Sequence, residues 1–467
     1  MERHVRLLRE LRRRGIAKAW LVGGVVRDFL LNKSPADIDV VCEESQAKTI
    51  IDKLGGAVTG KPPFCTVSTV LPILDEKGFS HKWNIEITLL TGGSIQKDLE
   101  RRDFTINAIA MDINGKMIDP FDGAADIRRR VLRLVPALTL PYEADPIRVV
   151  RLLRFACALD FSVDSMTELL TKNFIREHRG VLANVPQERY GKEFLKGFAS
   201  RPLDFLLSLE DYELLPVVLP EVEAMRGVEQ PAIFHPEGDV LAHTIRVVGE
   251  AQKEIRKHPE KRDVVLALAA LLHDVGKPRS ARPHPKYDRA CFFGHEKTGE
   301  LMVWDILSKW SIPGKITAQV TALVRHHMIP GGNFTERTCV KLIRKIGAET
   351  AEQLFTLALC DARGTLGTGD NILVARELFA QVHDNLYRAQ DASFRRWLDG
   401  NDVMDILKIQ PSREVGRVLE ELDVAVGAGE LHSREEAIEW LRRKFGRETK
   451  SGRWEGLERL SGTETRL

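Results

Sequence analysis

Two aspartates stand one residue apart in the apolar stretch DIDVV, residues 37–41. Successive side chains of a β-strand point to opposite faces, so Asp37 and Asp39 share the face opposite to Ile38. Their carboxylates would lie about 7 Å apart along the strand, and like charges so placed raise each other's pKa. Two Mg²⁺ ions about 3.5 to 4 Å apart, with shared carboxylate ligands, suit this arrangement. The alternative is a pair of exposed aspartates on an edge strand.

A third carboxylate is available in WNIEITLL, residues 83–90, where apolar and polar residues alternate. This alternation predicts a half-buried strand. Glu86 belongs to the polar set, so it can face the same side as the two aspartates from a neighbouring strand. Asp37, Asp39 and Glu86 can therefore present three carboxylates on one face, with the two aspartates as the expected metal ligands.

The stretch upstream of the aspartates, LVGGVVRDFLL (residues 21–31), predicts a strand that ends in two glycines, followed by a helix. Glycines let backbone N–H groups approach a phosphate chain closely, and a helix N-terminus favours its negative charge. A glycine pair alone usually marks only a turn. The pattern GGxxRD, followed nine residues later by DxD, is much narrower and points to nucleotide binding.

These motifs, together with RRDFTINAIAMD (residues 101–112), resemble the signature of bacterial tRNA nucleotidyltransferases and their poly(A) polymerase relatives, in the polymerase β superfamily. The resemblance implies that Asp37 and Asp39 are catalytic and hold two Mg²⁺ ions, which activate an RNA 3′-hydroxyl and bind the nucleotide triphosphate. It offers Glu86 as the third catalytic carboxylate. It implies tRNA, CTP and ATP as partners, and phosphoryl transfer without a covalent intermediate. The implied contacts to triphosphate and ribose fall on Gly23, Gly24, Arg27, Arg102, Asp103 and Asn107.

The stretch EADPIRVVRLLRFACALDF, residues 143–161, predicts a helix with Asp145 as N-cap and Pro146 as its first residue. Three-residue steps place Asp145, Arg148 and Arg151 on one face, all three as nucleotide-binding candidates. Asp145 and Arg148 match the family's Glu-Asp-x-x-Arg element, a protein template for the incoming base. One carboxylate acceptor plus one guanidinium donor suits cytosine and adenine, whereas uracil and guanine present the opposite order. Helix capping alone would also explain Asp145.

The sequence departs from the family pattern in two places. Ala144 stands where the family has glutamate, with Glu143 shifted by one residue, so the role of that position is open. Only the 14 residues 87–100 separate Glu86 from the RRDF motif. Family members that add the terminal A usually carry a longer, flexible segment there. The short segment predicts addition of the two cytidines without the A, rather than the full CCA.

A second set of candidate ligands lies further along the chain, where eight of the 13 histidines fall between His235 and His327. Their order, with LLHDVGKP and the pair His326-His327, resembles an HD-type metal phosphohydrolase. Imidazole plus carboxylate ligands suit Mn, Fe, Ni, Zn or Mg. Lys277 is a candidate phosphate contact, and hydrolysis of phosphoesters at RNA ends or on nucleotides is the implied task. The expected metal ligands are His243, His273, Asp274, His295, His326 and Asp361.

The elements that must position these residues change along the chain. Strand signals concentrate before residue 135, and amphipathic helical periods dominate after residue 145. The predicted fold is an α/β nucleotidyltransferase head followed by a mostly all-α neck, HD body and tail. Glu188 and Arg189, in a stretch that resembles a family helix-turn element, are expected to support the neck, and the tail to pack against tRNA. The predicted domains are 1–140 (head), 141–230 (neck), 231–370 (HD) and 371–467 (tail).

Composition agrees with a soluble, cytoplasmic enzyme. The net charge of +2 neither favours nor excludes a polyanionic partner, because binding needs a local patch. No apolar run approaches the roughly 20 residues of a membrane span, and six scattered cysteines without a CxxC pair indicate free thiols. Oligomeric state is left open. The alternative functions are a poly(A) polymerase, a metal phosphohydrolase with a relic head, and a non-catalytic RNA-binding protein; the intact acidic sites disfavour the last two.

Overall fold

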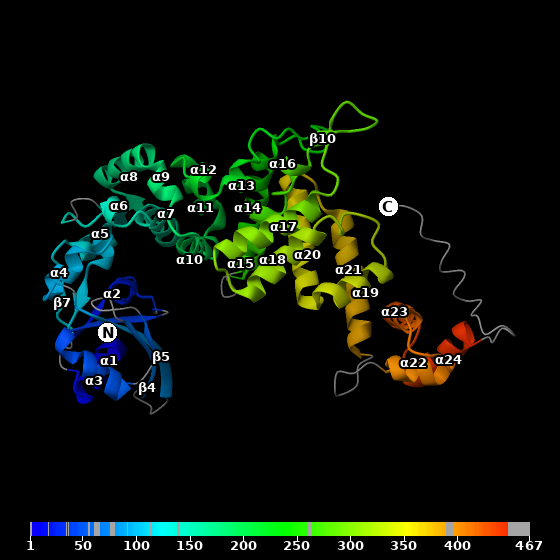
Figure 1. The fold of residues 1–467 in the computed structure, drawn as a ribbon, viewed down its shortest axis with the longest axis horizontal. Helices are drawn as coiled ribbons and strands as arrows, with labels where there is room; N and C mark the ends of the chain where they lie inside the picture. Colours follow the sequence, from blue (N-terminus) through cyan, green and yellow to red (C-terminus); the bar gives the residue numbers. More distant parts are fainter. Residues whose placement is uncertain are drawn as a thin grey trace. The chain divides into compact units, whose positions relative to one another are not determined.

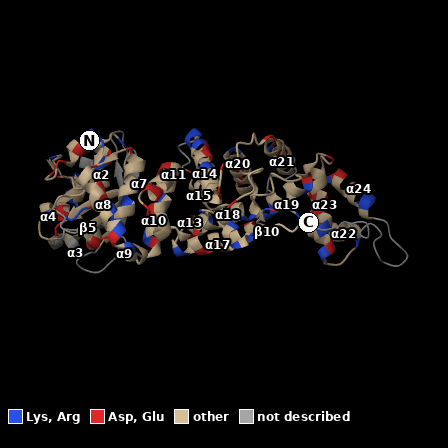
Figure 2. Ribbon diagram, turned by 90° about the horizontal axis from the view of Figure 1, so that it is seen from above, with Lys and Arg blue, Asp and Glu red and all other residues tan. Residues whose placement is uncertain are grey.

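The structure is a computed structural model that describes most of the chain in two compact units, Met1–Leu219 and Pro220–Leu467 (Figure 1). The division falls inside the predicted neck, and the finer division into four domains stays a prediction. Basic and acidic residues are interspersed along the helices of both units (Figure 2). None of the described helices is long and apolar enough to cross a membrane. The described residues are 2–16, 18–33, 35, 37–54, 57–59, 66–74, 80–90, 92–112, 114–137, 141–258, 263–388 and 397–446.

The described part of the first unit contains one large mixed sheet. Apolar residues of its central strands face the core: Ile38, Val40 and Leu21 are almost fully buried. Strands β1 (Ala19–Val22) and β2 (Ile38–Cys42) are antiparallel, whereas β2 and β5 (Ser80–Leu89) are parallel. The strand order is β3 (Ala57–Thr59), β4 (Thr66–Leu74), β5 (Ser80–Leu89), β2 (Ile38–Cys42), β1 (Ala19–Val22), β6 (Ala110–Met111) and β7 (Met117–Ile118).

Helices surround this sheet and continue beyond it. Several begin at residues whose side chains accept a hydrogen bond from the first turn, such as Ser94 and Asp164. A short parallel pair, β8 (Val131–Leu132) and β9 (Ser162–Val163), joins the sheet region to the helices. The helices are α1 (Glu2–Arg13), α2 (Gly24–Leu30), α3 (Ala47–Leu54), α4 (Ile95–Glu100), α5 (Gly123–Arg129), α6 (Pro141–Ala144), α7 (Arg148–Leu159), α8 (Ser165–Glu177), α9 (Arg179–Ala183), α10 (Gln187–Phe198), α11 (Pro202–Asp211) and α12 (Leu215–Val218), with short 3₁₀ turns η1 (Glu44–Gln46) and η2 (Thr105–Asn107).

The prediction that Asp145 caps a helix beginning at Pro146 is wrong. Helix α7 begins at Arg148, after a turn in which the Arg148 N–H donates to the Asp145 carbonyl at 3.1 Å. The Asp145 carboxylate is therefore not used for capping. The predicted apolar stripe of α7 is present, since Val149, Leu152 and Leu153 are buried.

The second unit is almost entirely helical in its described residues. Helix α15 (Val264–Leu272), VVLALAALL, is buried on nearly all sides. It contacts α14 (Val240–Lys257), α18 (Gly314–His326) and α20 (Ala348–Gly364). A small hairpin of β10 (Arg282–Pro283) and β11 (Ala290–Cys291) projects from this bundle. The helices are α13 (Pro220–Glu223), α14 (Val240–Lys257), α15 (Val264–Leu272), α16 (Lys277–Ser280), α17 (His295–Lys309), α18 (Gly314–His326), α19 (Glu336–Ile346), α20 (Ala348–Gly364), α21 (Asp370–Arg388), α22 (Gly400–Leu407), α23 (Arg413–Gly427) and α24 (Arg434–Phe445).

The predicted fold class is confirmed by these elements, a mixed α/β head followed by helices. The cysteines also behave as expected, since Cys42, Cys157, Cys291, Cys339 and Cys360 are free thiols. Cys65 lies outside the described residues.

Gly123, the first residue of α5, gives a test of packing in the head. A Cβ atom at this position would lie 2.1 Å from the carbonyl oxygen of Thr105, in the 3₁₀ turn η2. We expect Gly123→Ala to lower the free energy of unfolding by about 1 to 3 kcal/mol, because backbone must shift to admit the methyl group. Gly180→Ala is the matched control, since no heavy atom lies within 4 Å of its Cβ position. Urea unfolding of both variants measures the difference, and equal stabilities would contradict the expectation.

Candidate active sites

The first candidate site is a cavity of about 710 Å³ in the first unit. Every head and neck residue that the sequence analysis named as a catalytic or nucleotide-binding candidate lines it. The structure thus gathers residues from β2, β5, α2, η2 and α7, which are up to 128 positions apart (151 − 23). These residues are Gly23, Gly24, Arg27, Asp37, Asp39, Glu86, Arg102, Asp103, Asn107, Asp145, Arg148 and Arg151.

The three predicted catalytic carboxylates meet at one edge of the cavity. Asp39 on β2 lies directly opposite Glu86 on the parallel strand β5, and Asp37 immediately precedes β2. Burial raises the pKa of Asp39; Arg102 opposes this effect, while Glu86 and Asp37 add to it, and the pKa remains above its usual value. A bound cation would favour the ionised carboxylate, and an all-oxygen donor set suits Mg²⁺. The three residues therefore fit a magnesium site.

Gly23 leaves room for the side chain of Arg102. Its backbone has a φ of +66°, which residues with a Cβ rarely adopt, and a Cβ there would lie 2.7 Å from an Nη atom of Arg102. Arg102 is held from its other side by Asp98 of α4, to which Nη2 donates at 3.0 Å. The glycine thus allows a fixed guanidinium beside the Asp39 carboxylate.

A relay of charged and polar side chains crosses the cavity from the head to the neck helices. Arg27 Nη1 donates to the Asn107 side chain at 2.9 Å, and Asn107 donates to Asp103 at 2.9 Å. The second oxygen of Asp103 lies 2.7 Å from Arg151. Arg151 in turn donates to Glu193 on α10 at 3.1 Å. These contacts therefore couple the positions of the predicted nucleotide-binding residues to one another.

The buried Asp103 carboxylate depends on this relay. Burial alone would raise its pKa, but Arg151, Asn107 and the Phe104 N–H outweigh burial and hold the pKa below its usual value. Glu193 pairs with both Arg151 and Arg154. The sequence analysis did not select Glu193 or Arg154. The three-residue repeat of Arg148, Arg151 and Arg154 was a signal for the arginine; Glu193, five residues after Glu188, carried none by itself.

The predicted pair of base-selecting residues is only partly assembled. Arg189 on α10 lies 2.9 Å from one carboxylate oxygen of Asp145 and donates to the other at 3.0 Å. Arg148 instead donates to the main-chain carbonyls of Arg101 at 2.7 Å and Pro141 at 3.0 Å. Asp145 and Arg148 line the same cavity without a direct ion pair among the contacts described. Arg189, expected only to support the neck, is the guanidinium that holds Asp145.

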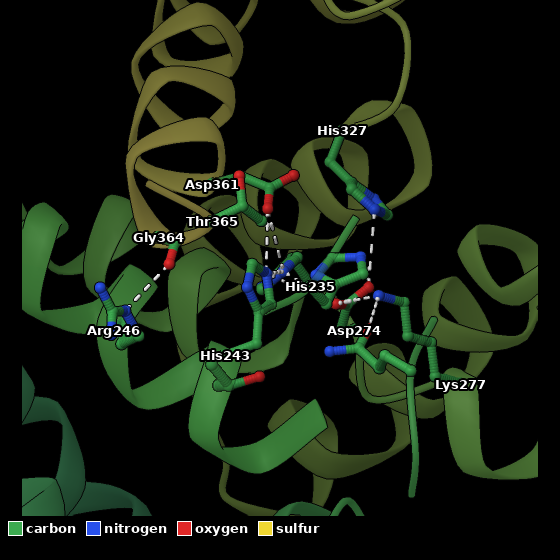
Figure 3. Close-up of polar contacts among 12 residues, drawn as sticks. His235, His243, Arg246, Asp274, Lys277, His327, Asp361, Gly364 and Thr365 are labelled. Carbon is green, nitrogen blue, oxygen red and sulfur yellow. Dashed lines mark hydrogen bonds and ion pairs between the residues drawn. The ribbon is translucent and has the colours of Figure 1, made fainter. Parts of the chain in front are cut away.

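The second candidate site is a cluster of histidines and carboxylates in the second unit (Figure 3). His243 comes from α14, His273 and Asp274 follow α15, His295 begins α17, and Asp361 lies on α20. Asp274 faces both halves of the cluster: one carboxylate oxygen lies 3.1 Å from His273 Nε2 and the other 3.3 Å from His295 Nε2. His243 Nε2 lies 3.0 Å from Asp361.

The hydrogen bonds around these imidazoles show why the cluster fits a metal ion. The Nδ1 atoms of His273, His295 and His327 each face a main-chain carbonyl at 2.8 to 3.0 Å. A proton on Nδ1 leaves Nε2 as an acceptor, and these Nε2 atoms point at other acceptors, among them Asp274. Burial lowers the pKa of His327 to about 4, which favours its neutral ring, whereas Asp274 and Asp361 outweigh burial at His273 and raise its pKa. Acceptors that converge in this way suit a divalent cation. The hydrogen bond at Nδ1 also fixes the orientation of each ring, as is usual for histidines that bind metal.

The prediction of His326 as a ligand is wrong in its register, because the next residue, His327, occupies that place. Its Nε2 lies 3.2 Å from His295 Nε2, and it forms a metal-ligand group with Asp274 and His295. His326 belongs to none of the metal-ligand groups found among the described residues. His326 is the last residue of α18, and it is the ring of the following residue, His327, that lies next to His295.

Two further residues contact the cluster, and one of them was not predicted. The buried Glu237 carboxylate lies 2.7 Å from His243 Nδ1, and it orients that ring. The sequence analysis did not select it; the HPE triplet before α14 was the only signal. Lys277, the predicted phosphate contact, lies 2.6 Å from Asp274 and donates to Gln230 at 2.7 Å.

Comparisons with known proteins match the regions of the chain that contain the two candidate sites. Family models match residues 19–133 (Poly A polymerase head domain), 168–226 (Probable RNA and SrmB-binding site of polymerase A) and 240–361 (HD domain). An A-adding tRNA nucleotidyltransferase of Deinococcus radiodurans is 30% identical over 91% of this chain and 95% of its own. A Multifunctional CCA protein of Pasteurella multocida is 30% identical over 79% of this chain and 89% of its own.

Solved structures share the fold at lower sequence identity. The Thermotoga maritima CCA-adding enzyme complexed with tRNA is 20% identical, with a TM-score of 0.58 over 95% of this chain and 96% of its own. The Bacillus stearothermophilus CCA-adding enzyme in complex with CTP is 22% identical, with a TM-score of 0.58 over 94% and 96%. The two relatives described above match this chain along most of its length. The chain therefore belongs to the bacterial tRNA nucleotidyltransferase family, and it is an enzyme with a nucleotidyltransferase head and an HD domain.

Proposed function

We propose that this enzyme adds nucleotides of the CCA tail to tRNA 3′ ends, from CTP and ATP, with two Mg²⁺ ions. The observation that carries the proposal is the single cavity that combines three carboxylates, several guanidinium groups and the Asp145 element. Similar proteins include CCA-adding enzymes solved with tRNA, ATP and CTP, in agreement with these substrates.

Different side chains of the cavity have different proposed roles in phosphoryl transfer. Asp37, Asp39 and Glu86 are the proposed metal ligands; bound Mg²⁺ would neutralise the triphosphate and favour the 3′-alkoxide. Arg27 and Arg102 line the cavity as donors for phosphate oxygens. The RNA 3′-oxygen attacks the α-phosphorus, pyrophosphate leaves, and no bond forms to the protein. The protein therefore contributes alignment and charge.

Two observations bear on which nucleotide is added. The short segment 87–100 contains the end of β5 and, from residue 95, the six-residue helix α4, whose Asp98 holds Arg102. This compact connection favours addition of cytidines without the terminal A. Similarity to a relative named as A-adding, over 91% of the chain, favours A addition as the second candidate. Poly(A) polymerase is the remaining alternative.

Primer extension tests this choice. Three tRNA transcripts, ending before the tail, after the first C and after the second C, are incubated with enzyme, Mg²⁺ and either CTP or ATP. We expect CTP to complete the first two transcripts, because the Asp145 element accepts cytosine and the short segment fits C addition. A single A added to the CC-ending transcript alone would identify an A-adding enzyme, and long A ladders a poly(A) polymerase. Extension of none of the transcripts would contradict nucleotide transfer altogether.

We further propose that the histidine cluster holds divalent metal and hydrolyses phosphoesters. The converging Nε2 atoms and the Asp274 carboxylate supply ligands, and Lys277 lies beside Asp274 as a phosphate contact. Glu237 and the main-chain carbonyls fix the ring orientations. The cluster opens into a cavity of about 1200 Å³, so a substrate can reach it.

Independent sites predict separable activities. Asp39→Asn should abolish nucleotide transfer and leave phosphoester hydrolysis intact, because it removes charge only from the first site. Asp274→Asn should do the reverse and also reduce metal bound to the second site. Primer extension, nitrophenyl phosphate hydrolysis and metal content of both variants provide the measurements. A protein that is mainly a phosphohydrolase would show no transfer even in the wild type.

Asp145 gives a test of base selection. Asp145→Asn removes an acceptor charge and introduces an amide donor, which suits uracil better than cytosine. We expect the ratio of kcat/KM for CTP to that for UTP to fall about tenfold or more, because the variant loses a hydrogen bond between the base and a charged group. The control is Asp164→Asn, because Asp164 caps α8 outside the cavity and asparagine caps equally well. An unchanged ratio would show that Asp145 only anchors Arg189.

A further inference from the structure

The wall of the first site includes an aromatic ring among its charged side chains. Phe155 on α7 lines the cavity and is only 5% exposed. Its ring centroid lies 3.9 Å from the guanidinium carbon of Arg154, 5.1 Å from that of Arg27 and 5.5 Å from that of Arg151. A cation within about 6 Å of a ring centroid is attracted by the negative face of the ring. Phe155 therefore gathers three positive charges, one of which, Arg27, is a proposed contact of the triphosphate.

The ring adds a restraint that the hydrogen bonds of Arg27 do not supply. The Nε and Nη2 atoms of Arg27 donate to Asp28 at 2.8 and 2.7 Å, and Nη1 donates to Asn107 at 2.9 Å. A guanidinium has five N–H donors in one plane, so the contacts described leave one N–H on each Nη atom for a ligand. Hydrogen bonds along the edge of the group restrain its tilt only weakly, whereas an aromatic ring against its face restrains the tilt directly.

Phe155 is itself fixed by packing between the head and α7. The ring of Phe104, the residue after Asp103, meets it edge to face, with centroids 5.8 Å apart. Phe104 is fully buried. Arg151 precedes Phe155 by four residues, about one helical turn, so the two side chains are neighbours on α7. The ring thus ties the position of Arg27, which comes from α2, to the helix that carries Arg151.

The chemistry of the ring matches its neighbours, beyond filling space. Asp28, Asp103 and Glu193 each pair with at least one of the three arginines, yet the guanidinium groups still repel one another. A leucine side chain at position 155 would also be apolar, but it would present no negative face to them. An aromatic ring lowers the cost of holding three cations together.

We propose that Phe155 is a positioning residue for nucleotide transfer: its π face holds Arg27 at the tilt at which the two remaining N–H groups meet the triphosphate. The inference rests on the proposed nucleotidyltransferase function and adds a residue that acts through Arg27. Arg27 would contact the triphosphate both before and during the reaction. Loss of the ring's negative face should therefore raise KM for the nucleotide and leave kcat nearly unchanged.

A series of fluorinated phenylalanines at position 155 tests the π face in the full-length enzyme. Fluorine withdraws negative charge from the face of the ring and changes its size little. 4-Fluoro-, 3,5-difluoro- and 3,4,5-trifluorophenylalanine are introduced, and KM is measured for the nucleotide that the wild type adds, CTP or ATP, on the tRNA transcript that it extends. We expect KM to rise with each fluorine, to about fivefold with three, as for loss of a cation–π contact.

The same fluorinated residues at position 198 are the matched control. Phe198 on α10 is fully buried and meets Phe205 edge to face at 5.4 Å, much as Phe155 meets Phe104. The ring contacts described for Phe198 are with phenylalanines only. An effect of fluorine on packing alone would change both series alike. A constant KM in the series at position 155, or an equal rise in the series at position 198, would overturn the proposal.

Equilibrium binding separates this inference from the proposed function. Isothermal titration calorimetry gives the Kd of CTP and of ATP with Mg²⁺ and without RNA. If the wild type binds nucleotide but transfers none, and Kd rises only in the series at position 155, the positioning role stands and the proposed function fails. If the wild type transfers nucleotide while Kd and KM stay constant in that series, the positioning role fails and the function stands. If nucleotide is neither bound nor transferred, both fail.

Discussion

The buried carboxylate of Asp103 is the charge on which the first site depends. A buried charge is tolerated only when partners replace the water it has lost, and removal of one partner is strongly destabilising. Asp103 receives Asn107 from its own turn and Arg151 from α7, and each of these partners has a further role in the cavity. Satisfying one buried charge therefore fixes the positions of residues in both the head and the neck helices.

In the second unit the constraint comes from buried hydrogen-bond acceptors that face one another. There the carbonyls behind the rings turn histidine nitrogens inward as acceptors, toward Asp274. Side-chain acceptors that face one another are unfavourable without a cation. The first site balances most of its carboxylates with fixed guanidinium groups, whereas this cluster has Lys277 at one edge.

The sequence predicted residue sets better than it predicted contacts. Period-two alternation was enough to bring Asp39 and Glu86 together, because strand geometry leaves a side chain only two faces. The two wrong predictions in helical segments have the same cause. Asp145 was assigned to a cap, and His326 was chosen over His327, because residue spacing does not say where a helix begins or which neighbour faces inward. Glu193 and Glu237 were missed, since each acts through another residue and has no motif of its own.

The arrangement of Arg148 shows why base choice is harder to infer than metal binding. Its guanidinium is held by the carbonyls of Arg101 and Pro141, so its direction depends on backbone positions in the head and in α6. Arg101 adjoins Arg102, which is tied to α4 through Asp98. A change in the length of segment 87–100 would move α4, and with it the carbonyl that Arg148 uses. On the proposed function, residues that never touch the base would thus alter which base is accepted, while the proposed metal ligands would remain the same.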